Sequence, residues 1–177
     1  LEVLRDAPVE THLVISKTAQ ITIAQETDYS VEQVRALADV CYKEGDFAAA
    51  ISSGSFKTMG MVVAPCSMRL LAEIATASGS SLIGRAADVT LKERRRLILL
   101  PREMPFHTIH LQHMLTLAQM GVVVAPPVPA FYSNPETLDD MVNHTVARVL
   151  DMLDVVELQP VADGLLKRWN GPRKTEA

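Results

Sequence analysis

The stretch that decides the fold runs from Gly60 to Met68 and reads GMVVAPCSM. Residues 60–65 form a short apolar run, which is typical of a strand buried on both faces. The run stops at Cys66-Ser67-Met68, and a helical pattern follows from about Arg69 to Thr76. Because parallel strands need a crossover connection, usually a helix, a buried strand that leads directly into a helix indicates a parallel sheet.

The same alternation of short apolar runs and helical patterns extends to both sides of this stretch. Ser30-Val31-Glu32-Gln33 is a capping-box signature for one of these helices. Residues 39–58 are mixed and polar, and we expect irregular structure there, with room for one short edge strand. The pattern predicts an α/β fold with helices on both faces of a parallel sheet. We expect strands at 9–15, 60–65, 96–100 and 122–125, and helices at 18–26, 31–38, 69–76, 82–93, 109–120 and 135–153.

The size and charge of the chain narrow its class. Its 177 residues fit one domain with a sizeable core, which we place at residues 1–153, followed by a polar, weakly ordered tail at 154–177 apart from Trp169. A net charge of −4 argues against a nucleic-acid partner, which needs clustered basic residues. Two cysteines make no disulfide framework, and no apolar run is long enough to span a bilayer. We therefore expect a cytoplasmic protein with no membrane partner.

Polar or reactive side chains, of kinds that a turn does not itself require, follow several of the predicted strands. Ser16-Lys17, Cys66-Ser67, Arg102-Glu103 and Tyr132 all stand where a strand ends or shortly after it. In parallel α/β sheets, ligands bind beyond the carboxyl ends of the strands. Ser67 also stands just before a helix, where free backbone N–H groups attract an anion. The sequence therefore predicts a ligand site at this edge of the sheet.

Five motifs at and between these positions follow one another in a fixed order: APCSM at 64–68, RAADV at 85–89, LKERR at 91–95, PREMP at 101–105 and PPVPAFY at 126–132. Together they closely resemble the UbiX-type flavin prenyltransferases, including the small B subunits of phenolic and hydroxyaryl acid decarboxylase systems. The likeness runs from Leu1 to about Leu153 and resumes near Arg168-Trp169-Asn170-Gly171.

This resemblance implies a flavodoxin-like, Rossmann-type α/β/α fold, in which the chain is a single flavoprotein domain. It implies that the protein joins a dimethylallyl group from dimethylallyl phosphate to N5 and C6 of reduced FMN, without a metal. The prenylated FMN would pass to a UbiD-type decarboxylase, and the protein would form a homododecamer built of trimers. The family opens with a strand and a Gly-rich turn that holds the FMN phosphate. No such turn precedes Leu1, so we expect a truncated or disordered start.

The resemblance also implies roles for particular residues. Leaving phosphate requires fixed positive charge and hydrogen-bond donors, which arginine, lysine and tyrosine supply. The matching phosphate set is Lys92, Arg102, Tyr132, Arg148 and, with a smaller share, Arg85. The matching FMN contacts are Ser16, Ser67, Met68, Arg69, Leu70 and Arg102. Glu26 and Glu103 match acidic positions that could relay protons, and with Ser67 and Lys92 they form the expected catalytic set.

Other interpretations remain open from the residues alone. The chain could be a flavin-dependent cysteine-type decarboxylase, although those enzymes rely on a histidine after an early helix, or a non-catalytic flavin-carrying subunit of an aromatic acid decarboxylase. For Arg94, Arg95 and Arg96 we favour a solvated charge run at a helix end. His107, His110 and His113 rotate steadily around a helix without a carboxylate, so we expect no metal site. We expect Cys66 to be a buried, unreactive thiol.

Overall fold

The structure is a computed structural model that describes residues 1–165 and 168. The chain divides into two compact units, Leu1–Pro127 and Val128–Ala177, and each is described by itself. The prediction for Trp169 falls outside the described residues. Within the described residues, no helix combines the length and the apolar character needed to cross a membrane.

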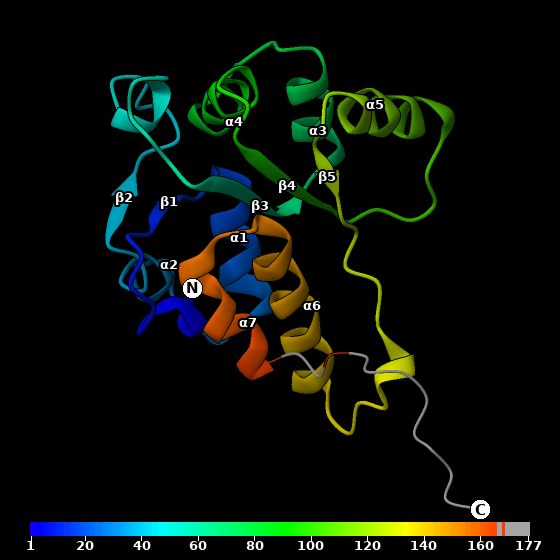
Figure 1. Ribbon diagram of the computed structural model, residues 1–177. Helices are drawn as coiled ribbons and strands as arrows, with labels where there is room; N and C mark the ends of the chain where they lie inside the picture. The colour runs from blue at the N-terminus through cyan, green and yellow to red at the C-terminus, as the bar shows by residue number, and fades with distance from the viewer. Residues whose placement is uncertain (166–167, 169–177) are drawn as a thin grey trace, which may run out of the picture. The chain divides into compact units, whose positions relative to one another are not determined.

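Strands and helices alternate along the first unit, as the sequence predicts (Figure 1). Each predicted strand and helix of this unit is present, with its ends shifted by a few residues, and β2 occupies part of the stretch expected to be irregular. The elements are η1 (Glu2–Leu4), β1 (His12–Val14), α1 (Lys17–Glu26), α2 (Val31–Arg35), β2 (Val40–Tyr42), η2 (Ala50–Ser52), β3 (Gly60–Cys66), α3 (Met68–Ala75), α4 (Leu82–Lys92), β4 (Arg96–Pro101), α5 (Thr108–Gln119) and β5 (Val123–Val124).

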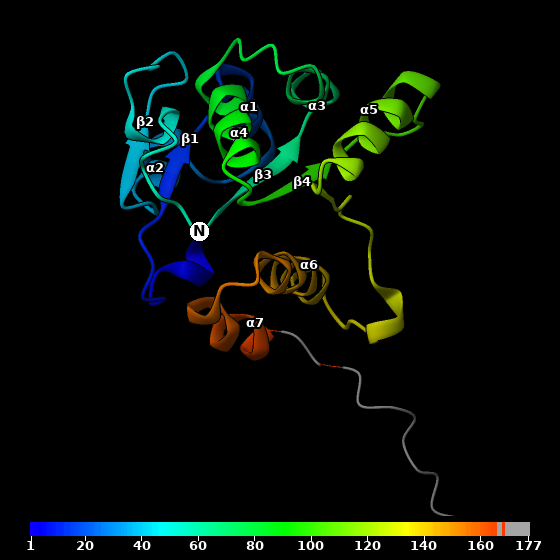
Figure 2. The same cartoon turned by 45° about the horizontal axis from the view of Figure 1, so that its top comes forward.

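All strand pairs of this unit are parallel, and they form two sheets. β1 pairs with β2, and β3 lies beside β4 in the other sheet (Figure 2). β5 pairs with the other side of β4, so β4 is the central strand of this three-stranded sheet. In the larger sheet, Val63 lies opposite Leu99, and Leu99 lies opposite Val124. The register of β3 shifts between Val63 and Cys66, next to the carboxyl end of the strand. Parallel sheets with flanking helices confirm the predicted flavodoxin-like α/β fold.

The central strand β4 carries the core of this unit. Its residues from Leu97 to Pro101 are all buried. Leu97 and Leu99 point to one face of the sheet, because side chains alternate along a strand. There they pack in a cluster with Leu71 of α3, Ala87 of α4 and Leu117 of α5. Apolar burial of this kind is the main stabilising contribution to such a fold.

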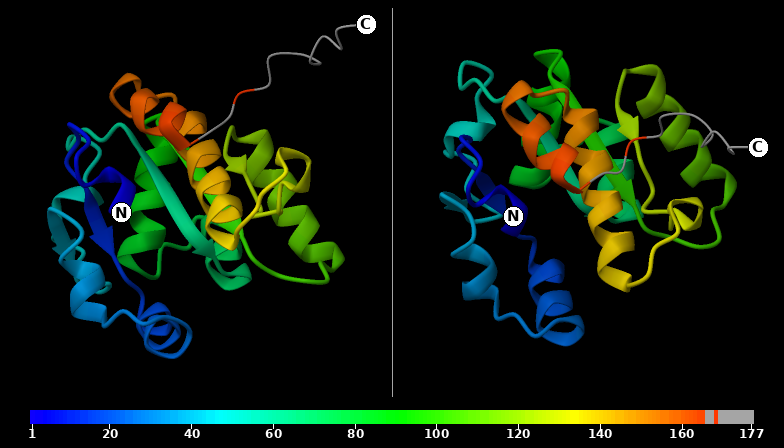
Figure 3. Two further views of the ribbon diagram at one scale, coloured as in Figure 1. Left: turned by 90° about the horizontal axis from the view of Figure 1, so that it is seen from below. Right: turned by 60° about the horizontal axis from the view of Figure 1, so that its bottom comes forward.

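The second unit is helical over its described residues and contains η3 (Phe131–Ser133), α6 (Leu138–Leu153), η4 (Val156–Leu158) and α7 (Gln159–Leu165). α6 begins three residues later than predicted because Thr137 caps it, in a capping box with Asp140. α7 packs against α6 (Figure 3). The two elements after α6 correct the expectation of a weakly ordered tail, since Leu158 and Ala162 are buried there.

Candidate active site

Two predicted site residues meet at the carboxyl edge of the three-stranded sheet. Cys66 and Pro101 are paired in neighbouring strands, so Ser67 and Arg102, which follow them, leave the sheet side by side. The N–H of Arg102 also donates to the carbonyl oxygen of Cys66 at 3.4 Å. Both Ser67 and Arg102 are exposed, as is Glu103, the next residue. The convergence expected from the strand ends is therefore present for these three residues.

Ser67 caps the amino end of α3, where backbone N–H groups are available to bind a ligand. Its Oγ accepts a hydrogen bond from the N–H of Leu70 at 3.2 Å, which makes it the N-cap of the helix. The first N–H groups of a helix, here those of Met68 and Arg69, have no acceptor within the helix and lie at its positive end. The predicted FMN contacts from Ser67 to Leu70 thus form one turn of backbone with donors directed away from the helix.

Ser16 has the same role at the start of α1. It follows β1, and its Oγ accepts from the N–H of Ala19 at 3.1 Å. Two serine-capped helix starts, one after a strand of each sheet, supply the hydroxyl and N–H donors that flavin oxygens and a phosphate accept. The residues present therefore fit FMN.

Glu26 lies far from this helix start. It is the last residue of α1, a helix of 10 residues, so about 15 Å of helix separates it from Ser16. Its side chain is exposed. Within one chain, the structure does not bring Glu26 to the end of α1 that Ser16 occupies.

Lys92 occupies the opposite edge of the sheet from Arg102. It ends α4, and β4 begins four residues later. β4 is 6 residues long, so it separates its two ends by about 20 Å. The physical reason is the crossover connection: α4 returns the chain to the amino end of the sheet, and its last residue stays there. One chain therefore does not bring Lys92 and Arg102 together.

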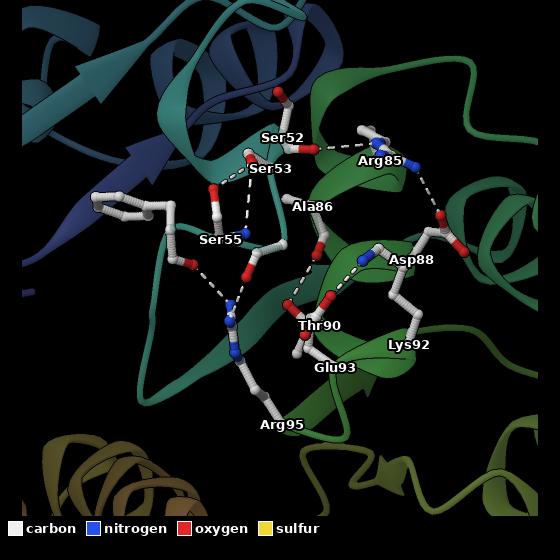
Figure 4. Close-up of polar contacts among 12 residues, drawn as sticks. Ser52, Ser53, Ser55, Arg85, Ala86, Asp88, Thr90, Lys92, Glu93 and Arg95 are labelled. Carbon is white, nitrogen blue, oxygen red and sulfur yellow. Dashed lines mark hydrogen bonds and ion pairs between the residues drawn. The ribbon is translucent and has the colours of Figure 1, made fainter.

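Lys92 lies against a loop of small residues before β3, as Figure 4 shows. A Cβ added to Gly54 would be 2.6 Å from Lys92 Nζ and 2.2 Å from Glu93 Oε1, so only glycine leaves room for both side chains. Lys92 forms an ion pair with Glu93. Ser53 and Ser55, on either side of Gly54, join their hydroxyls at 2.9 Å. The loop therefore carries a pair of bonded hydroxyls on either side of the glycine against which the Lys92 ammonium lies.

Arg85 ties one end of this loop to α4. Its Nε donates to the carbonyl oxygen of Ser52 at 3.2 Å, and its Nη1 lies 3.0 Å from Asp88 Oδ2. Arg85 is only partly exposed. Arg85, which was predicted to bind phosphate, therefore binds a backbone carbonyl and a neighbouring carboxylate in this structure.

Arg95 ties the other end of the loop and was not predicted as a site residue. Its Nη1 donates to the carbonyl oxygen of Phe56 at 2.8 Å, and its Nη2 donates to that of Gly54 at 2.7 Å. Arg94, next to it, is exposed and has a left-handed backbone with φ of 56°. The interpretation as a solvated charge run is wrong for Arg95. Nothing in the three consecutive arginines distinguishes the one that turns inward.

The second unit brings Tyr132 close to the helix face that carries Arg148. The Tyr132 hydroxyl lies 3.4 Å from His144 Nε2, and the two rings meet edge to face at 5.8 Å. His144 and Arg148 are four residues apart on α6 and so share a face. Arg148 Nη1 donates to Asp151 Oδ2 at 2.7 Å. His144 was not singled out from the sequence, although its spacing from Arg148 is the signal that could have found it.

Two other candidate chemistries involve cysteine and histidine. Burial raises the pKa of the Cys66 thiol to about 12, so this thiol stays protonated near neutral pH. His107 stacks on His110, with ring centroids 3.5 Å apart. Among residues 1–165 and 168, no group of three or more His, Cys, Asp or Glu side chains is arranged to hold a metal ion.

Comparison with known proteins assigns a family to this arrangement. Residues 1–158 match the family model described as Flavoprotein. A probable UbiX-like flavin prenyltransferase from Streptomyces sp. (strain D7) is 56% identical over 178 residues, covering 100% of this chain and 86% of the relative. The flavin prenyltransferase UbiX of Escherichia coli (strain K12) is 50% identical over 172 residues, covering 97% of this chain and 89% of the relative.

Solved structures that resemble this chain point to the same family. A dodecameric FMN-dependent UbiX-like decarboxylase from Escherichia coli O157:H7 superposes with a TM-score of 0.88 at 55% identity, covering 96% of this chain and 89% of the other. AnUbiX (PadA1), solved with FMN and dimethylallyl pyrophosphate, gives a TM-score of 0.89 at 49% identity, covering 96% and 87%. The cypemycin decarboxylase CypD, at 17% identity and a TM-score of 0.54, shares the fold alone. The chain belongs to the UbiX family of flavin prenyltransferases.

Proposed function

We propose that the protein transfers the dimethylallyl group of dimethylallyl phosphate to N5 and C6 of reduced FMN and releases phosphate. The supporting observation is the likeness to AnUbiX, which shares the fold at 49% identity and was solved with FMN and dimethylallyl pyrophosphate. FMN, when bound in its reduced form, supplies the two atoms that accept the allyl carbons. The residues of this chain bind the reactants, hold the leaving phosphate and move protons.

The leaving phosphate sets the main electrostatic demand. The C–O bond of dimethylallyl phosphate breaks, and the phosphate leaves with the electron pair, so negative charge grows on it as the allyl group becomes cationic. Fixed positive charge stabilises that transition state without rearranging during the reaction. Arg102 offers a planar pair of donors, Lys92 a compact charge and Tyr132 a neutral hydroxyl. Arg148, one helical turn from the partner of Tyr132, completes this set in our proposal.

Binding of FMN is proposed for the carboxyl edge of the sheets. Ser16 and Ser67 cap the helices whose first N–H groups face this edge. Glu103 follows Arg102 directly and is exposed, so its carboxylate is placed to accept a proton at the same edge. Glu26 remains the second proposed proton carrier.

The opposite positions of Lys92 and Arg102 favour a site completed between subunits. We propose a homo-oligomer, a dodecamer built of trimers, in which one chain supplies Lys92 and another supplies Arg102. The related decarboxylase from Escherichia coli O157:H7 is dodecameric. This chain also exposes large apolar side chains around α5, as expected for a surface that another copy covers. They are Met104, Ile109, Leu111, Leu115 and Met120.

The destination of the product is a further part of this proposal. Prenylated FMN carries a new ring, and it acts as a cofactor only in an enzyme that binds it. We propose a UbiD-type decarboxylase as this recipient. We propose the cytoplasm as the place where both proteins meet.

Mass spectrometry of the flavin tests the reaction directly. After incubation with reduced FMN and dimethylallyl phosphate, we expect the flavin to gain the mass of one prenyl group. Lys92→Ala and Arg102→Ala should each lower the rate by about a hundredfold, since each removes a fixed charge from the leaving anion, and Tyr132→Phe by about tenfold. Lys43→Ala, which removes an exposed lysine elsewhere in the first unit, is the control.

Three results would contradict the proposal in different ways. An unmodified flavin together with an oxidised thiol product would favour a cysteine-type decarboxylase. An unmodified flavin with unchanged activation of a partner decarboxylase would favour a flavin-carrying subunit. Full turnover in all three site variants would show that these side chains do not hold the phosphate.

A further inference from the structure

Arg95 is the residue in Figure 4 that joins the end of α4 to the loop before β3. Its guanidinium binds two carbonyl oxygens of this loop, those of Gly54 and Phe56, at 2.7 and 2.8 Å. About forty residues of chain separate the arginine from these partners. Arg95 is only partly exposed. A planar guanidinium with two parallel donors fixes both the distance and the orientation of such a segment.

These contacts decide which groups of the loop remain available beside Lys92. The carbonyl oxygens of Gly54 and Phe56 turn toward Arg95, and that of Ser52 turns toward Arg85. A carbonyl oxygen directed at a bound anion would repel it, whereas one bound to arginine does not. The carbonyl oxygen of Ser53 accepts from the N–H of Phe56, and the hydroxyls of Ser53 and Ser55, which bond to each other, are the side-chain donors that this loop carries.

The loop also determines where Lys92 can lie. Gly54 has no Cβ, and the space that a Cβ would fill is taken by Lys92 Nζ and Glu93 Oε1. The ammonium group therefore rests on the loop that Arg95 holds. Glu93 is exposed, so its carboxylate can turn to solvent when another anion takes its place beside Lys92.

We propose that Arg95 is a positioning residue: by holding the carbonyls of Gly54 and Phe56, it fixes the loop against Lys92 as one preorganised part of the binding site for the allylic phosphate. This inference rests on the proposed function. Arg95 touches no substrate in this scheme, and it acts through the loop and Lys92.

The test compares three arginine variants with direct ligand binding. Protein loaded with oxidised FMN does not turn over, so the dissociation constant of dimethylallyl phosphate can be measured by titration calorimetry. Arg95→Ala should weaken binding by about tenfold, because the loop and Lys92 lose their fixed position. Arg95→Lys should recover part of the loss, since one ammonium replaces a fork that spans two carbonyls. Arg94→Ala, one residue away and exposed, should bind like the unaltered protein.

Turnover separates positioning from a general loss of structure. In Arg95→Ala the KM for dimethylallyl phosphate should rise in parallel with the dissociation constant, while kcat falls less. A merely structural arginine would lower the melting temperature and the active fraction and leave both constants unchanged. Binding within twofold of Arg94→Ala would overturn the proposal, whatever happens to the melting temperature.

Gly54→Ala gives a second test with Arg95 intact. Its methyl group would displace Lys92 Nζ and Glu93 Oε1, which are the ends of flexible side chains, so the fold should persist while phosphate binding weakens about as much as in Arg95→Ala. Unchanged binding in Gly54→Ala would refute the role of the loop. If the protein binds dimethylallyl phosphate in an Arg95-dependent way but never prenylates FMN, the proposed reaction fails and this inference stands. Absence of binding would overturn this inference.

Discussion

Replacing Ser67 with alanine should affect both the stability of the fold and the affinity for FMN, by amounts that can be separated. The Ser67 hydroxyl caps α3 by accepting the N–H of Leu70 at 3.2 Å. Loss of a serine N-cap costs about 1 kcal/mol, which for a domain of this size lowers the melting temperature by about 2–4 °C. Loss of one neutral hydrogen bond to the flavin costs about 1 kcal/mol, which is about fivefold in the dissociation constant.

Two further variants separate the contributions. Ser67→Asp keeps an N-cap acceptor and adds a negative charge at the positive end of α3, so it should keep the melting temperature. It removes a hydroxyl donor and adds negative charge beside an anionic ligand, so FMN affinity should fall further than in Ser67→Ala. Ser30→Ala removes the N-cap of α2, away from the proposed flavin contacts, and should lower stability alone.

The assay combines thermal unfolding of the flavin-free protein, followed by circular dichroism, with titration of FMN fluorescence. Equal FMN affinity in Ser67→Ala and the unaltered protein would refute the placement of FMN at the start of α3. A melting temperature in Ser67→Asp as low as in Ser67→Ala would refute the capping argument. Capping of α3 and contact with FMN are therefore tested independently.

Two other predictions concern ionisable groups. A thiol-alkylating reagent at neutral pH should label the exposed Cys41 and leave Cys66 unmodified until the protein unfolds, since burial raises the pKa of Cys66 to about 12. Mass spectrometry of the intact protein measures the labelling, and modification of both cysteines in the native state would contradict this prediction. Hydrogen bonding to Arg168, followed by the nearby charges of Arg168 and Arg148, lowers the pKa of Asp151 from its usual value of 3.8. The stability that ionised Asp151 contributes is therefore present above pH 3.8, and it is lost as the pH falls through the lowered pKa of the folded state. The stability difference between the unaltered protein and Asp151→Asn, measured by denaturant titration, should be constant above about pH 5 and shrink toward pH 2, and a difference that stays constant would count against this ion pair.

Local sequence patterns were sufficient for most of the fold. β4 is an apolar run from Leu97 to Pro101 that is buried throughout, as the pattern predicts. β3 also forms a strand, but Val62, Ala64 and Pro65 are exposed, so the expectation of burial on both faces is wrong for β3. β2 was harder because it has three residues and polar surroundings, so its hydrogen bonds to β1 decide it. α7 is short and contains Gly164, which lowers helix propensity, whereas Pro160 lies in the first turn, where proline is tolerated. It forms because tertiary contacts supply what local propensity lacks, including the burial of Ala162.

Site residues that directly follow strand ends could be predicted from the sequence. Residues whose place depends on contacts between distant parts of the chain could not. Ser67 and Arg102 follow paired strands, so topology alone brings them together. Lys92 was grouped with them by family likeness, and its place at the end of a crossover helix puts it at the opposite edge in one chain. Arg95 looked like its neighbour Arg94 because the carbonyls that bind it lie about forty residues earlier.

The central position of β4 has a consequence for motion at the site. Its backbone is hydrogen-bonded on both sides, and its side chains from Leu97 to Pro101 are enclosed. Amide hydrogens in such a strand exchange with solvent only when a large part of the surrounding structure opens. Arg102 follows this strand without an intervening loop. The exposed Arg102 side chain can change rotamer while its Cα stays anchored to a strand that we expect to exchange slowly, so the edge of the sheet should keep its geometry until cooperative unfolding.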